Sequence, residues 1–511
     1  SRSRTATKER TMLMSDSWYK VDNVAKVFLA TASQRDPRVF RISCTLNEEI
    51  DPDTLNEALR STAQEWPQFQ VTLHRGLFWH YFESTDQLPT AQPETKAPCA
   101  PLYTPERRNK LIYRVTYFGA RINLEMFHAI TDGNGGLLYL KSIVRNYLAL
   151  RHPGEMENVP SPNSASAGDM AQDSFRNFYE GTKRKKPAKK PKVYRPHGFL
   201  PYSQLQFFEG HLSSKQVLER SHALGVSMTS YLGASFMLAI YHDMPALERK
   251  KPICISLPVN LRNYYPSETA RNFFNSVCIA HTLTPEDTLE TVAPVFDAKL
   301  KEVLKPENIR AQMDAYEKLE HIPGIRPVPL VIKNAAVKFF TKLEDRHVSA
   351  VVSNMGRVSI PEGMKPYIHN FAAFSSCKTL FTVVCSYGDD LVLGTASALR
   401  STAICSAFTG SLPRMGWMLP CTLRRWKDEY LPHCHIRVGG DTAYCPLCQN
   451  RLSGPAGEPY FPATAPRIHR ASLLYKIVAF VLSALIVVAG AFDFLLMEDT
   501  PHRHFSILMA V

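Results

Sequence analysis

The chain has 511 residues, 45% of them hydrophobic, and this length exceeds a single ordinary core, so we expect two or more domains. Its eleven cysteines are an odd number, which argues against a full disulfide framework and suits a reducing compartment. The formal net charge of +13 indicates a basic surface. Such a surface can attract phosphate groups or anionic lipid headgroups, although lysines on a solvated loop are the plainer explanation.

Residues 51–64 show the spacing of an amphipathic helix that ends before Pro67. Asp51 or a nearby threonine can cap its start. Its predicted buried face consists of Leu55, Ala58, Leu59 and Ala63. Further along, the runs 111–118 and 122–128 alternate apolar and polar residues, which predicts a half-buried hairpin.

The second hairpin strand ends at His128, and residues 137–147 after it have helical spacing. Asp132 and Gly133 therefore lie on the turn into a helix, and with His128 they form an HxxxDG pattern. An imidazole held at a strand end can act as a general base near neutral pH. For an isolated motif, a buried and hydrogen-bonded histidine would be the favoured explanation.

A basic stretch with Pro187 and Pro191 follows, and we interpret residues 183–197 as a crossover linker. Nucleic acid is not the expected partner, because the prolines break any helix and no aromatic residues are interleaved for base stacking. Helical patterns at 213–220 and 229–241 then open a second lobe. The glycines at 135 and 136 do not complete a phosphate-binding motif.

Four segments in this order resemble the chloramphenicol acetyltransferase-like superfamily, which includes condensation domains and alcohol acetyltransferases. The segments are 18–28, the HxxxDG pattern, 258–262 with 271–275, and 352–356, and the resemblance covers roughly residues 17–395. It implies an α/β (α+β) fold of two lobes, each a mixed sheet covered by helices. The lobes would span residues 17–182 and 198–397, with the active cleft between them.

The resemblance also implies direct acyl transfer in a ternary complex, with His128 as base. Asp132 would brace the loop by pairing with an arginine, for which Arg262 is the candidate. Gly133 would let the backbone turn tightly beside the ring. The residues assigned to substrate binding are Asn260, Arg262, Asn272, Asn275, Ser353 and Asn354. The alternatives are that Asn272 and Asn275 only end a strand, and that Ser353 and Asn354 cap a loop.

Residues 398–430 show neither a helical nor a strand period, although the second lobe would be expected to end in a helix there. In residues 431–453, a CxxC pair and one further cysteine suggest a structural zinc ribbon. Its ligands would be Cys434, His435, Cys445 and Cys448. The usual ribbon has two CxxC pairs, so an inert reduced thiol group is the alternative.

Residues 473–497 form a largely apolar stretch of the length that a membrane-spanning helix needs. A buried terminal helix is the alternative. Basic residues precede the stretch and no secretory signal is apparent at the start, which predicts a membrane-anchored protein whose catalytic domain is cytoplasmic.

We therefore expect an acyltransferase that uses acyl-CoA, such as acetyl-CoA, or a carrier-bound thioester. The acceptor would be an alcohol or amine, with membrane lipid as a further partner. The alternative is a non-catalytic, condensation-like scaffold module anchored at the membrane. A zinc-ribbon membrane adaptor, with the large domain as a ligand sensor, is a third reading that rests on the tail alone.

Overall fold

The computed structural model describes two units, of which residues up to Thr422 form the first and residues from Leu423 the second. The described parts of the first unit are 18–104, 109–161, 165–181, 191–200, 204–318, 327–412 and 419–420. In the second unit, β16 (Glu429–Leu431) and β17 (Ile436–Val438) form an antiparallel pair.

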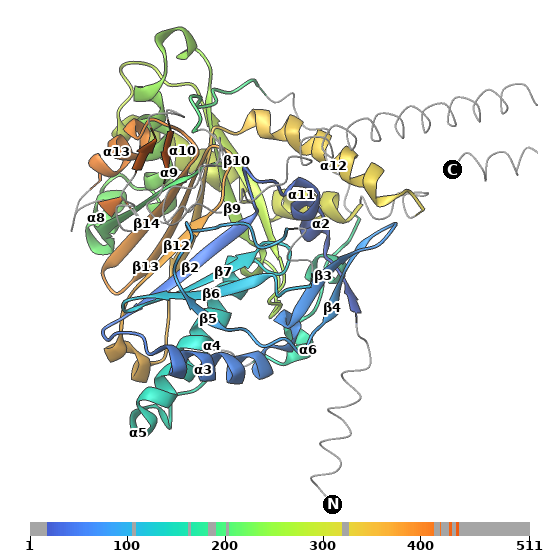
Figure 1. Cartoon of the computed structure of the whole chain (residues 1–511). Helices are drawn as coiled ribbons and strands as arrows, with labels where there is room; N and C mark the ends of the chain where they lie inside the picture. Colours follow the sequence, from blue (N-terminus) through green and yellow to red (C-terminus); the bar gives the residue numbers. More distant parts are fainter. Residues whose placement is uncertain are drawn as a thin grey trace, which may run out of the picture. The chain divides into compact units, whose positions relative to one another are not determined.

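The first unit contains a five-stranded sheet whose middle strands are β2 and the predicted hairpin (Figure 1). In spatial order its strands are β12 (Ile368–Ser375), β2 (Val39–Leu46), β7 (Arg121–Phe127), β6 (Tyr113–Phe118) and β5 (Ala91–Pro93). Helices α3 (Pro52–Glu65) and α4 (Gly133–Arg151) pack against each other and cover one face of this sheet.

A seven-stranded mixed sheet forms the second lobe, in which β11 runs parallel to both of its neighbours. Its order is β10 (Phe274–His281), β9 (Ile253–Asn260), β11 (Ala350–Arg357), β13 (Leu380–Tyr387), β14 (Asp390–Ser397), β8 (Gln206–Ser213) and β15 (Leu419–Pro420). Leu391 and Leu393 of β14 face one core, whereas Val392 and Ala396 face the other. This sheet is therefore buried on both faces.

The two lobes share a strand. β12 follows β11 in the chain, yet it pairs with β2 of the first sheet, where Phe371 lies opposite Cys44. The sequence boundaries of 17–182 and 198–397 did not anticipate this exchange. Because β12 completes the sheet that carries His128, both lobes contribute to the frame of the motif.

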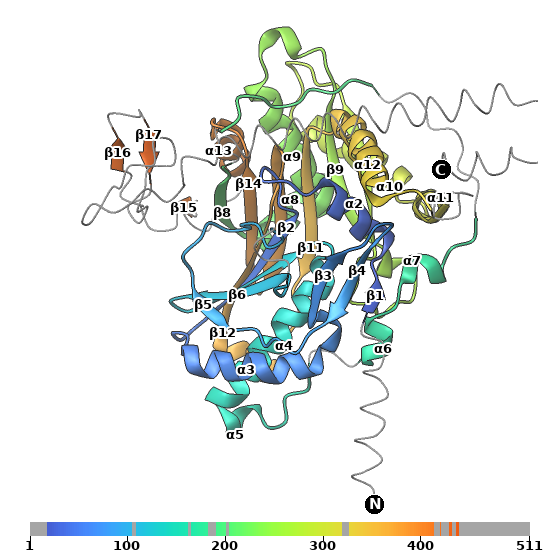
Figure 2. The same cartoon turned by 45° about the vertical axis from the view of Figure 1, so that its right-hand side comes forward.

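A small sheet of β1 (Trp18–Lys20), β4 (His80–Ser84) and β3 (Val71–Arg75) lies beside α2 (Asn23–Thr31), as Figure 2 shows. The longer helices of the second lobe are α8 (Ser214–Ala223), α9 (Met228–Asp243), α10 (Leu289–Val303), α11 (Pro306–Lys318) and α12 (Leu330–Glu344). Short helices are α5 (Pro153–Met156), α6 (Ala167–Met170), α7 (Ser174–Asn177) and α13 (Ala403–Gly410).

Local sequence signals located α3 well. Asp51 caps α3 by accepting the N–H of Thr54, and the four residues predicted for its buried face are all buried. Residues 398–430 show no helical or strand period in the sequence. The structure places α13 there, packed on α9 through Phe408 and Phe236, whose ring centroids are 4.7 Å apart. This is the closing helix that the second lobe was expected to have.

The described residues include no single helix that is both long and apolar enough to cross a membrane. Helices α8 and α9 meet those criteria only as a pair, bent by 87° between them.

An ion-pair network joins the two large sheets. Arg121 of β7 donates two hydrogen bonds to Glu209 of β8, at 2.7 and 2.8 Å. His211 lies between Glu209 and Asp390, with nitrogen–oxygen distances of 3.2 and 3.0 Å. Hydrogen bonds, first to Asp390 and then to Glu209, raise the pKa of His211 to about 9.

This raised pKa predicts that the protein loses stability as pH rises from 6.5 to about 9. Protonated His211 stabilises the folded state fully below 6.5, and this contribution, up to about 3 kcal/mol, is lost by about 9. Thermal unfolding midpoints should fall across this range in the native chain and fall less in His211→Gln. Equal slopes for both proteins would contradict the prediction.

Candidate active site

His128 is the first residue after β7, on the turn that leads into α4. Its backbone N–H donates to the carbonyl of Arg38 at 2.8 Å, which continues the pairing of β7 with β2 by one residue. The sheet therefore fixes the backbone that carries the imidazole, at the strand end where the sequence predicted it.

Three aromatic rings from three elements surround the imidazole of His128. Phe28 of α2 stacks on it with centroids 4.3 Å apart, Phe40 of β2 meets it edge-on at 5.0 Å, and Phe274 of β10 lies at 5.6 Å. Burial among these rings lowers the pKa of His128, although the nearby Asp132 carboxylate opposes that effect. The imidazole is therefore neutral at physiological pH, as a general base must be.

Asn272, in the loop before β10, orients the ring. Its side-chain Oδ1 lies 3.2 Å from His128 Nδ1, and its Nδ2 donates to the backbone carbonyl of His128 at 3.0 Å. An amide oxygen at Nδ1 favours the tautomer that carries its proton there. Nε2 is then the nitrogen with a free lone pair.

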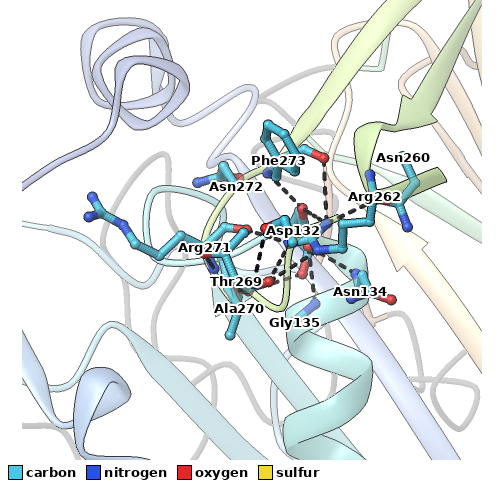
Figure 3. A network of polar contacts seen from close by, with 12 residues as sticks. Asp132, Asn134, Gly135, Asn260, Arg262, Thr269, Ala270, Arg271, Asn272 and Phe273 are labelled. Carbon is cyan, nitrogen blue, oxygen red and sulfur yellow. Dashed lines mark hydrogen bonds and ion pairs between the residues drawn. The ribbon is translucent and has the colours of Figure 1, made fainter. Parts of the chain in front are cut away.

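Asp132 caps α4. One carboxylate oxygen accepts the N–H groups of Asn134 and Gly135 at 3.1 and 3.0 Å. The other accepts from Phe273 N–H at 2.9 Å and from Arg262 Nη1 at 2.8 Å (Figure 3). The ion pair predicted between Asp132 and Arg262 is therefore present, and it ties the histidine turn to the second lobe.

Arg262 was also predicted to bind substrate, and in the structure its guanidinium lies in bonds within the protein. Its guanidinium donates to the backbone carbonyls of Thr269, Arg271 and Phe273 at 2.7–3.4 Å, in addition to Asp132. Asn260 Oδ1 also accepts from its Nη1, at 3.1 Å. Arg262 thus holds the 269–273 loop that carries Asn272, and Asn260 holds Arg262 (Figure 3).

The remaining predicted binding residues lie in other contacts. Asn275 is buried and donates to Gln312 of α11 at 2.8 Å. Asn354 lies within β11, where it donates to Thr229 of α9 at 2.9 Å and accepts the N–H of Gly356 at a shift in the strand register. Ser353 pairs with Val383 within the sheet. In the described structure, none of these bonds reaches His128, so binding roles for them stay predictions.

The tight approach at the motif falls on Gly135, not Gly133. Gly133 has no positive φ, and a Cβ added there would lie 3.7 Å from Met355 Cε, an ordinary contact. A Cβ at Gly135 would lie 2.2 Å from both the Ala270 carbonyl oxygen and Thr131 Oγ1. The first turn of α4 and the 269–273 loop thus touch backbone to backbone at Gly135, and Gly133 shows neither a positive φ nor such a close approach.

Gly135→Ala should therefore destabilise the protein by roughly 1 to 3 kcal/mol, the usual cost of overpacking. Gly133→Ala is the matched control and should stay within about 0.5 kcal/mol of the native chain. Urea unfolding midpoints measure both. Equal midpoints for the two variants would show that the 269–273 loop moves to make room for the added methyl group without lowering the free energy of unfolding.

Sequence reasoning missed most of the residues that shape the site. Phe28 lies in the segment that carried the resemblance, but nothing in its period indicated a contact with a histidine one hundred residues on. Met355, beside Gly133, shows that the 352–356 segment approaches the motif through its methionine. Tertiary packing alone reveals such contacts.

A shallow hollow of about 410 Å³ lies between β10 and α10. Ile279, Ala298 and Val303 are among its lining residues, with Lys299 at its edge, and none of them touches His128. The active cleft expected between the two lobes stays a prediction.

The predicted zinc ligands and the predicted membrane segment lie outside the described residues. Among the residues that are described, no group of His, Cys, Asp and Glu side chains is arranged to hold a metal ion.

Comparison with known proteins bears on the fold. No family model matches the sequence. An uncharacterized protein of Mycobacterium tuberculosis, Rv2305, is 24% identical over 356 residues, a match that covers 63% of this chain and 79% of that protein.

Solved structures give a clearer likeness. TRI101 of F. graminearum, complexed with coenzyme A and deoxynivalenol, superposes with a TM-score of 0.54 at 12% identity, over 76% of this chain and 96% of that one. A mutant starter condensation domain of rhizomide synthetase RzmA, complexed with C8-CoA, gives 0.50 at 11% identity, over 80% and 99%. The chain thus has a two-lobed, condensation-domain-like fold with mixed sheets, which confirms the predicted fold class of that region.

Proposed function

We propose that this protein is an acyltransferase that moves an acyl group from acyl-CoA to an alcohol or amine, with His128 as general base. One observation carries the proposal: a neutral imidazole, enclosed by Phe28, Phe40 and Phe274, has Nδ1 held by Asn272, and no described residue is hydrogen-bonded to its Nε2. The fold supports it, since TRI101 and the RzmA domain, which share that fold, were both captured with CoA compounds.

In the proposed reaction, His128 moves one proton while the acyl group passes from the thioester to the acceptor. His128 Nε2 takes the proton of the acceptor hydroxyl or amine while the acceptor oxygen or nitrogen attacks the thioester carbonyl carbon. The tetrahedral intermediate collapses, the carbon–sulfur bond breaks, and the CoA thiolate takes the proton back from Nε2. No serine or cysteine nucleophile is required, because the thioester is already activated.

The first test is release of free CoA from acetyl-CoA in the presence of pooled alcohols and amines. Acceptor-dependent release would support the proposal and rank the acceptors. Octanoyl-CoA and a carrier-bound acetyl group, run in parallel, decide between donors. Binding of a carrier protein without turnover of any donor would support the alternative, a non-catalytic scaffold module.

The lowered pKa of His128 predicts where kcat/KM falls on the acidic side of the pH profile. Because burial disfavours the imidazolium, His128 stays neutral to a pH below 6.5, its ordinary value. Values of kcat/KM measured across pH should therefore begin to fall only below 6.5. A limb centred above 6.5 would contradict burial as the dominant influence on this residue.

We further propose that the protein lies against an anionic membrane, from which it takes a hydrophobic acceptor. Helix α12 presents Phe339 and Phe340 to solvent at 60% and 64% exposure, with Val331 and Ile332 also exposed. Exposed Lys338 and Lys342 lie on the same helix, which matches the composition of interfacial helices.

Other contacts support this surface. The β3–β4 hairpin is tied to α12 by a hydrogen bond from Leu330 N–H to the Leu77 carbonyl, at 2.8 Å. It adds the exposed side chains of Leu77 and Trp79. Helix α12 also packs on α2, which carries Phe28 beside the imidazole. A membrane at α12 would therefore lie near the proposed catalytic residue.

Sedimentation with lipid vesicles tests this part of the proposal. The full chain should bind neutral and anionic vesicles through residues 473–497. A chain that ends at Thr422, the end of the first compact unit, should bind only anionic vesicles, and the double change Phe339→Ser and Phe340→Ser should abolish that binding. Leu247→Ser is the control, since Leu247 is exposed elsewhere. If the shortened chain binds neither kind of vesicle, the proposal that α12 binds the membrane is wrong.

The cytoplasmic location and the structural zinc remain parts of the proposal that rest on sequence alone. Protease protection in sealed vesicles would test the location of the catalytic unit. Metal content measured for the full chain and for the double change Cys445→Ser and Cys448→Ser would test the zinc ribbon. Equal metal content in both proteins would dismiss the ribbon without touching the catalytic proposal.

A further inference from the structure

Asn272 connects His128 to a buried carboxylate that the reaction does not use. Asp22 caps α2, and its Oδ1 accepts the N–H of Ala25 at 2.6 Å. Its other oxygen, Oδ2, lies 3.4 Å from Asn272 Nδ2. Both side chains are almost completely buried, at 1% and 2% exposure, so water does not compete for these contacts.

These contacts allow only one orientation of the Asn272 amide. Its Nδ2 faces two acceptors, the Asp22 carboxylate and the His128 backbone carbonyl at 3.0 Å. A flipped amide would set its oxygen against both of them. The amide oxygen must therefore face His128 Nδ1, where the distance is 3.2 Å.

The charge state of Asp22 decides how strongly that orientation is held. Burial raises the pKa of Asp22 to about 6, while the charge of Arg271, whose Nε lies 3.7 Å from Oδ2, opposes the rise. At neutral pH the carboxylate is ionised in most molecules. An ionised carboxylate accepts a hydrogen bond about twice as strongly as a neutral group does.

We propose that Asp22 is a positioning residue that fixes the tautomer of His128 through Asn272. Asp22 accepts a hydrogen bond from the amide NH₂, the amide oxygen then accepts a hydrogen bond from Nδ1–H, and Nε2 keeps the lone pair that takes the proton of the acceptor. The inference rests on the proposed function for its catalytic consequence. The tautomer itself is a property of the free protein.

Asp22→Asn tests this in the full chain. The new amide keeps the size of the side chain and an oxygen that can cap α2, but its NH₂ can donate to Asn272 and turn that amide over. Nitrogen-15 signals of the imidazole, assigned by their loss in His128→Gln, should show a single Nδ1–H tautomer in the native protein and a mixture in Asp22→Asn. The kcat should fall about tenfold with KM little changed.

The matched control is Asp51→Asn. Asp51 caps α3 with a bond of 2.8 Å to Thr54 N–H, and its change should leave both tautomer and kcat as in the native chain. If Asp22→Asn fails to fold, Asp22→Ser keeps the cap but is too short to hold Asn272, and the same mixture is expected. A single native tautomer in a folded Asp22 variant would overturn the inference. The nitrogen-15 measurement of the tautomer needs no substrate. Its result can therefore be told apart from a failure of the proposed function.

Discussion

Replacing His128 with alanine should lower acceptor-dependent release of CoA from acetyl-CoA by about a hundredfold or more, the scale expected for loss of a general base. The acceptor would still bind, but its proton would have to leave to water. The imidazole occupies a space between three rings, so the variant also leaves a gap beside Phe28 and Phe40. Initial rates should therefore be compared at a temperature where urea unfolding shows both proteins folded.

His152→Ala is the matched control for that experiment. Its imidazole stacks on Tyr367 with centroids 4.3 Å apart, the same distance that separates His128 from Phe28. The control thus removes a histidine that stacks on one aromatic ring outside the proposed site, and its rate should match that of the native chain. A rate for His128→Ala that stays near the native value would reject His128 as the base.

Local patterns predicted the parts of the site that depend on neighbours in the chain. The structure has both elements, the strand β7 before His128 and the helix α4 after it. The alternation predicted a half-buried strand, but β7 is buried on both faces, since Asn123 and Glu125 are as buried as their apolar neighbours. The pairing of Asp132 with Arg262 came from the resemblance, not from any period. The structure shows what this ion pair does: Asp132 also caps α4 and accepts a hydrogen bond from the Phe273 N–H, so the pair joins α4 to the 269–273 loop.

The features of the fold and the site that the sequence did not predict depend on contacts between distant parts of the chain, which no local pattern encodes. The exchange of β12 into the first sheet brings Phe371 opposite Cys44. The sequence also shows that residues 133, 135 and 136 are glycines, but not which of them meets another backbone. Gly135 is that glycine, because the Ala270 carbonyl of the 269–273 loop leaves no room for a Cβ there.

Arg262→Met should destabilise the protein by on the order of 3 to 5 kcal/mol, the usual cost of breaking a buried ion pair. The Asp132 side chain is only 6% exposed, and the variant would leave its carboxylate charged without a counterion. The change would also strip the carbonyls of Thr269 and Arg271 of their donors. Urea unfolding measures the loss.

An exposed ion pair serves as the control for this prediction. Arg310 pairs with Glu180 at the surface, where the side chains are 44% and 54% exposed. Because solvent screens such a pair, Arg310→Met should cost no more than about 1 kcal/mol. Equal losses from the two changes would show that burial adds nothing to the Asp132–Arg262 pair.

The activity of the Arg262 variants separates stability from positioning. Arg262→Lys keeps the charge beside Asp132 but cannot reach the carbonyls of the 269–273 loop with a planar fork. That loop carries Asn272, so its loosening should shift the amide at His128 Nδ1 and lower kcat by roughly tenfold, even where the protein is fully folded. A folded Arg262→Lys with native kcat would mean that Asp132 alone holds the loop through the Phe273 N–H, and that the arginine serves only to neutralise it.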